Sequence, residues 1–103
     1  MKNVTFINRV YPGNDWDYKA VVFRTTNTTG HPTDLVYGII HCGGHTYESF
    51  ETYTGENYIN GAPNKSYSRA TRNISSVPEL YANHFKEMKE IHEKTLWSTV
   101  EKS

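Results

Sequence analysis

The sequence predicts an α+β fold, in which an antiparallel sheet of about four strands carries a C-terminal amphipathic helix packed on one face. Three observations predict this fold. Residues 1–54 are rich in β-branched and aromatic side chains, and Gly43-Gly44 divides two such runs as a two-residue hairpin turn. Residues 76–100 then repeat apolar side chains at three- and four-residue steps, as in a helix.

The first two predicted strands are Val4–Tyr11 and Trp16–Thr26, separated by the turn cluster Pro12-Gly13-Asn14. Alternation along the second strand places one group of side chains on the same face of the sheet, namely Trp16, Tyr18, Ala20 and Val22. A loop is expected over Thr25–Asp34, because turn-forming residues interrupt the pattern there, at Asn27, Gly30 and Pro32.

The third and fourth predicted strands, Leu35–Cys42 and His45–Thr54, form a hairpin around Gly43-Gly44. A two-residue turn fixes which side chains face each other across the hairpin. On one face the predicted pairs are Cys42 with His45, Ile40 with Tyr47, and Gly38 with Ser49. On the other face they are His41 with Thr46, Ile39 with Glu48, and Tyr37 with Phe50.

The C-terminal helix is predicted over residues 76–100. Ser76 is its expected N-cap, with Glu79 closing a capping box. Its apolar stripe comprises Tyr81, Phe85, Met88 and His92, flanked by Leu80, His84, Ile91 and Trp97. Because no second helix is predicted, this stripe must pack on the sheet.

Size and charge exclude several classes of protein. The 103 residues fit a single domain, 1–103, with residues 55–75 as an irregular basic loop between sheet and helix. Eleven basic residues balance eleven acidic ones, which argues against a protein that coats an extended duplex nucleic acid. The apolar runs are too short to cross a membrane, and Cys42, the single cysteine, has no disulfide partner. We therefore expect a cytoplasmic protein.

Two small groups of side chains near the predicted hairpin could carry chemistry. Cys42 and His45 could form a thiolate–imidazole pair or two ligands of a metal, but zinc needs further ligands, so a structural thiol is the preferred interpretation. His41 with the diagonal neighbour Glu48 is the better acid–base candidate, although such pairs also occur as ordinary surface contacts. The sequence predicts no metal site and no cofactor.

A local basic segment is the most informative candidate for binding. Residues 61–78 carry three cations and no acidic residue. Their side chains could hold an anionic ligand or simply form a solvated loop. The predicted binding residues are Tyr58, Asn64, Lys65, Tyr67, Arg69 and Arg72.

We expect a non-catalytic binding protein, a small accessory inhibitor or modulator of a host protein. The abundance of Asn, Thr, Tyr and Lys is typical of small phage proteins, and eight tyrosines favour contact with a protein or with an anionic ligand such as a nucleotide. Its sheet edges could also pair with a second copy to give a homodimer. The alternative is a small phosphodiester-cleaving enzyme or nucleotide-binding protein that uses His41, Glu48, Arg69 and Arg72.

Overall fold

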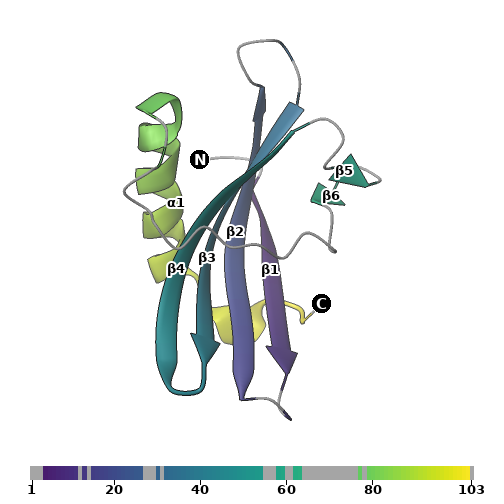
Figure 1. The fold of residues 1–103 in the computed structure, drawn as a ribbon, viewed down its shortest axis with the longest axis vertical. Helices are drawn as coiled ribbons and strands as arrows, with labels where there is room; N and C mark the ends of the chain where they lie inside the picture. The colour runs from purple at the N-terminus through teal and green to yellow at the C-terminus, as the bar shows by residue number, and fades with distance from the viewer. Residues whose placement is uncertain are drawn as a thin grey trace.

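The computed structural model describes residues 4–11, 13, 15–26, 30, 32–54, 58–59, 62–63, 77 and 79–102. Four antiparallel strands form one sheet in the order β1-β2-β3-β4, so that every strand pairs with its neighbours in sequence (Figure 1). Their bounds are β1 Val4–Tyr11, β2 Trp16–Thr26, β3 Pro32–Cys42 and β4 His45–Thr54. With one helix on the sheet, the predicted α+β fold is confirmed.

The β3–β4 hairpin has the predicted register. Cys42 pairs with His45, and the ladder continues through Gly38 with Ser49 to Tyr37 with Phe50. Gly43 and Gly44 have φ values of 57° and 81°, which glycine adopts without the steric penalty of a side chain. The turn is also tied to the end of the neighbouring hairpin, because the Gly43 amide donates to the Asp15 carbonyl at 3.3 Å.

The loop predicted over Thr25–Asp34 is too long, because both flanking strands continue into it. Pairing extends through Arg24 with Asp34 and Thr25 with Thr33, and it reaches Pro32, the first residue of β3. The Arg24 guanidinium lies 3.0 Å from the buried Asp34 carboxylate, which stabilises this end of the ladder. A proline is tolerated as the first residue of a strand.

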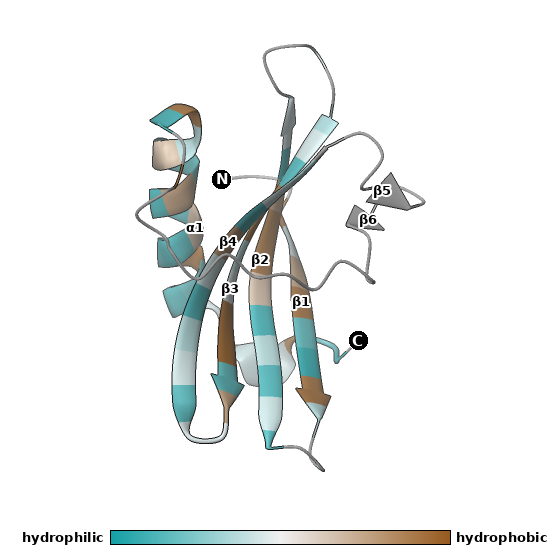
Figure 2. Cartoon of the chain, viewed as in Figure 1, coloured by the Kyte–Doolittle hydropathy of each residue, from teal (hydrophilic) through white to brown (hydrophobic). Residues whose placement is uncertain are grey.

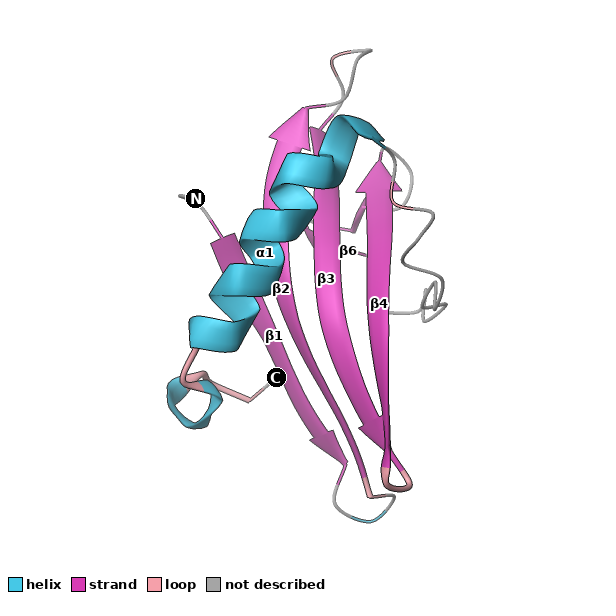
Figure 3. Ribbon diagram, turned by 90° about the vertical axis from the view of Figure 1, so that its left-hand side faces the viewer, coloured by secondary structure: helices cyan, strands magenta, loops and turns pink. Residues whose placement is uncertain are grey.

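Helix α1 (Ala82–Lys94) lies across one face of the sheet, as Figure 3 shows. Its Met88 is fully buried in a core cluster made by Val21, Leu35, Tyr37 and Phe50. Leu80, which the sequence placed beside the apolar stripe, is instead 60% exposed. It belongs to the 3₁₀ helix η4 (Glu79–Tyr81), whose turn differs from that of the α-helix.

The helix is shorter than the predicted range 76–100. It begins at Ala82 without a side-chain cap, and the expected cap residue Ser76 lies outside the described residues. It ends at Lys94 because side chains take over its last carbonyls. Thr95 Oγ1 donates to Ile91 O at 2.6 Å and Trp97 Nε1 donates to His92 O at 3.2 Å.

Beyond the helix, the chain crosses to β1 through the 3₁₀ helix η5 (Trp97–Thr99). The side-chain amide of Asn8 on β1 donates to Trp97 O at 3.2 Å and to Val100 O at 2.9 Å. The ring of Phe6 meets that of Trp97 edge-on, with centroids 5.7 Å apart. The C-terminal segment is therefore fixed to the α1 side of β1.

The face opposite α1 has a second buried cluster, formed by Ala20, Val22, Val36 and Tyr53. The short strands β5 (Tyr58–Ile59) and β6 (Ala62–Pro63) pair with each other and lie on this side (Figures 1 and 3). They fall within the range 55–75, which the sequence predicted to be irregular. Within the described residues, no helix combines the length and apolarity needed to cross a bilayer.

Candidate functional site

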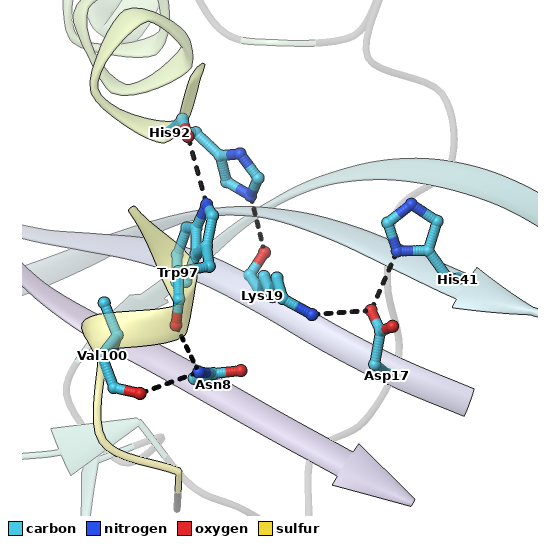
Figure 4. Close-up of polar contacts among 7 residues, drawn as sticks. All are labelled: Asn8, Asp17, Lys19, His41, His92, Trp97 and Val100. Atoms are coloured by element: carbon cyan, nitrogen blue, oxygen red, sulfur yellow. Dashed lines mark hydrogen bonds and ion pairs between the residues drawn. The ribbon is translucent and has the colours of Figure 1, made fainter. Parts of the chain in front are cut away.

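Polar side chains form a small network on the α1 side of the sheet (Figure 4). His41 Nδ1 donates to Asp17 Oδ1 at 2.9 Å, and Lys19 Nζ lies 3.4 Å from the same oxygen. Partial burial acts to raise the pKa of Asp17, but the His41 hydrogen bond and the Lys19 charge outweigh it and lower that pKa. The carboxylate thus orients a half-exposed imidazole.

The predicted pair of His41 with Glu48 is wrong as a direct contact. Glu48 Oε2 accepts a hydrogen bond from Tyr37 Oη at 2.6 Å and lies 3.5 Å from Lys89 Nζ. Burial, together with this bond to Glu48, raises the pKa of Tyr37. The hairpin register correctly made the two side chains neighbours, but β2 sets Asp17 directly opposite His41 and α1 supplies Lys89 to Glu48.

His92 and its neighbours have a structural role. The His92 Nε2–H donates to Lys19 O at 2.9 Å, and the ring packs against those of Tyr37 and Trp97 at 5.5 and 4.7 Å between centroids. Burial lowers the pKa of His92, so the neutral ring is favoured. This histidine joins α1 to the sheet and leaves the Asp17–His41 pair as the exposed polar group of Figure 4.

Cys42 and His45 face each other across the turn, as predicted. The Cys42 thiol is free and partly exposed, and the His45 ring lies 6.3 Å from that of Tyr47. Among the residues that the structure describes, no three His, Cys, Asp or Glu side chains come together as a metal site would need.

The predicted binding residues of the basic segment lie beyond what the structure describes. Tyr58 belongs to β5, but its side chain is outside the described part. The others are outside it entirely: Asn64, Lys65, Tyr67, Arg69 and Arg72. Their role in binding stays a prediction.

A group of aromatic side chains lies on the side opposite α1, at the end of the sheet that carries both tight turns. Register places them in two rows across the four strands. The row nearest the turns is Tyr11, Trp16, Cys42 and His45, and the next is Arg9, Tyr18, Ile40 and Tyr47. We call these eight residues the aromatic face.

The rings of the aromatic face contact one another. Tyr11 and Trp16 meet edge-on with centroids 4.7 Å apart, and Trp16 lies 6.4 Å from Tyr18. Tyr18 covers Gly38, where an added Cβ would fall 2.9 Å from the Tyr18 hydroxyl oxygen. The glycine therefore leaves room for the Tyr18 ring against β3, and Trp16 packs between Tyr11 and Tyr18.

Exposure distinguishes the aromatic face from the rest of the same side. Tyr11 is 43% exposed and Trp16 is partly exposed, whereas Ala20 and Val22, further along the sheet, are buried. Figure 2 shows that hydropathy also changes along β2, which is brown near its middle and pale to teal toward the β1–β2 turn. Among the described residues of this side, the sheet thus leaves large rings accessible at the end that carries the turns.

The sequence contained part of the signal for this surface. Alternation put Trp16 and Tyr18 on one face, and the hairpin register put Ile40 beside Tyr47. The missing step was the pairing of β1 with β2, which brings Tyr11 opposite Trp16 and Arg9 opposite Tyr18. The sequence therefore predicted contacts through exposed aromatic side chains and the basic segment, but it did not indicate which rings share this surface.

Comparison with known proteins identifies no relative. No family model matches the chain, and no curated protein or solved structure matches it either. Function must therefore be inferred from the residues themselves.

Proposed function

We propose that this chain is a non-catalytic binding protein that holds a larger protein through the aromatic face. The observation that carries the proposal is the cluster of Tyr11, Trp16 and Tyr18, whose rings are in contact and partly accessible. Trp, Tyr and Arg dominate the residues that contribute most binding energy at protein interfaces. Rings that are already packed lose little conformational entropy when a partner covers them.

A protein partner suits this surface better than a nucleic acid. Arg9 is the only Lys or Arg among the eight residues of the aromatic face, and the whole chain has zero formal charge. Binding to a nucleic acid backbone depends on several cations that neutralise phosphates. We also propose that it is a small inhibitor or modulator of a host protein, because its abundance of Asn, Thr, Tyr and Lys is typical of small phage proteins. The cytoplasm, where a thiol such as Cys42 stays reduced, is the compartment we propose.

The proposal is tested by capture from a lysate of a candidate host cell with immobilised protein. We expect one discrete protein to be retained at a constant ratio, and Trp16→Ala to reduce its retention by about tenfold or more. Leu80→Ala is the matched control, because Leu80 is exposed on the α1 side and should leave retention unchanged. Both variants must keep the circular dichroism spectrum of the parent. Equal capture by Trp16→Ala and the parent would contradict the proposal.

A second candidate function is supported by the Asp17–His41 pair. A carboxylate that orients an imidazole is one component of acid–base catalysis, so a phosphodiester-cleaving enzyme or a nucleotide binder stays an alternative proposal. Hydrolysis of a generic phosphodiester by the pure protein, abolished in His41→Ala and retained in His45→Ala, would favour it. No hydrolysis above the rate of the buffer would leave the binding protein as the better proposal.

A further inference from the structure

The two edges of the sheet differ in how well they are protected against pairing with another strand. β4 carries carboxylates at Glu48 and Glu51. Glu51 is buried on the face opposite α1. Charged side chains of this kind discourage a further strand from joining an edge. β1 has one charged residue, Arg9, in eight residues that pair with β2 without a bulge or a proline.

β1 also exposes apolar side chains. Phe6 and Val10 are each 38% exposed on the α1 side, and Tyr11 is exposed on the other. The C-terminal segment reaches β1 through the Asn8 side chain, from the α1 side and not along the edge. A regular, weakly charged edge strand with exposed apolar side chains is a strong candidate for pairing with another strand.

The sequence of β1 is suited to pairing with itself. In an antiparallel pair about a two-fold axis perpendicular to the sheet, side chains on the α1 side must face others on that side, so the axis passes through a residue position. Centred on Asn8, Phe6 faces Val10 of the partner subunit and Ile7 faces the partner's Arg9. Centred on Arg9, two like charges would face each other, which is unfavourable.

A centre on Ile7 pairs as many residues of β1 as a centre on Asn8, but it covers less of the exposed apolar surface. It would set Phe6 against Asn8 of the partner subunit, and Asn8 is already buried under the C-terminal segment. It would also leave Tyr11 beyond the residues that pair within the two strands. The centre on Asn8 alone matches Phe6 with Val10 of the partner subunit on each side of the axis.

We propose that β1 pairs antiparallel with β1 of a second copy of this chain, about a two-fold axis at Asn8. The two sheets then continue into one, with both α1 helices on one side and both aromatic faces on the other. The inference goes beyond the proposed function, since it assigns a partner to the backbone edge of β1, whereas the proposed function uses side chains on the face of the sheet.

Sedimentation equilibrium over a range of protein concentrations tests the dimer. We expect a reversible monomer–dimer equilibrium, weakened about tenfold or more by Val10→Lys, because the lysine would face Phe6 of the partner subunit. Thr52→Lys is the matched control, since Thr52 is exposed on β4 and also lies on the α1 side. A monomer at every concentration, or a dimer weakened by Thr52→Lys and not by Val10→Lys, would overturn the proposal.

Amide hydrogen exchange by NMR gives a second readout that needs no variant. As the protein concentration rises, the β1 amides that point away from β2 should become protected, while the outer amides of β4 should not. Concentration-independent exchange along β1 in a dimeric sample would overturn pairing through this edge. Capture of the larger protein by monomeric Val10→Lys would show that the proposed function holds whether or not the dimer does.

Discussion

At the scale of single residues, Glu51 is the side chain whose environment opposes its usual charge. It is buried on β4, where its carboxylate accepts a hydrogen bond from the Tyr53 hydroxyl. Burial raises the pKa of Glu51 more than this hydrogen bond lowers it. Burial and the nearby Glu51 charge also raise the pKa of Tyr18 in the aromatic face. The negative charge of Glu51 is therefore unfavourable in the folded protein.

Glu51→Gln should stabilise the protein at neutral pH. The pKa of Glu51 is higher in the folded than in the unfolded chain, so the folded state binds more protons and loses stability as pH rises from about 4.5 through the folded pKa. Glutamine removes this loss and keeps an oxygen for Tyr53. We expect the free energy of unfolding at pH 7 to increase, as urea denaturation would measure.

Comparing the stability of Glu51→Gln with that of the parent at pH 4 tests whether the charge of Glu51 causes the difference. Most of the gain should disappear there, because the carboxyl group is then protonated in both the folded and the unfolded chain. Glu101→Gln, at an exposed position, should change stability little at either pH. A gain of equal size at pH 4 and pH 7 would show that the charge of Glu51 is not its source.

At the scale of elements, short sequence patterns predicted correctly the features that neighbouring residues determine. The Gly43-Gly44 turn fixed the register of β3 and β4, and each pair named from the sequence is found. Errors arose where specific pairing decides and residue composition does not. The ends of β2 and β3 are extended by pairs such as Thr25 with Thr33, and the helix ends where the Trp97 side chain bonds back to it. The partner of His41 likewise comes from β2, which the hairpin alone could not indicate.

Met88→Ala tests how strongly α1 depends on the sheet. Met88 is fully buried between the helix and β2, β3 and β4, so its truncation leaves a cavity that the surrounding strands cannot fill. We expect the free energy of unfolding to fall by about 2–5 kcal/mol, as calorimetry or urea denaturation would measure. Leu80→Ala, at an exposed position just before α1, should cost much less. Similar losses in the two variants would contradict this description of the core.

At the scale of the whole molecule, opposite charges balance, and the aromatic face brings together four rings, those of Tyr11, Trp16, Tyr18 and Tyr47. The composition predicted a protein that binds through its rings, but only the pairing of all four strands shows which rings share a surface. The three cations of the basic segment lie outside the described residues. Single-sequence reasoning could thus give the kind of side chain, whereas the assembled sheet was needed to give its position.

Ionic strength should have little effect on the complex with the protein partner. The aromatic face contributes apolar contact and a single arginine, and exposed charges are screened within about 8 Å at physiological salt. We expect affinity to change by less than about threefold between about 50 and 200 mM salt, measured by calorimetry. A loss of about a thousandfold over the same range would indicate phosphate contacts and a nucleic acid ligand.

The hydrogen bonds from Asn8 to Trp97 and Val100 can form only after the C-terminal segment has been synthesised. Each strand can join the one made just before it, so the sheet can assemble progressively during synthesis. β1 is the first of these strands, yet its contacts on the α1 side wait for residues made after the helix. In a nascent chain that still lacks those residues, the α1 side of β1 would be exposed to solvent and to chaperones.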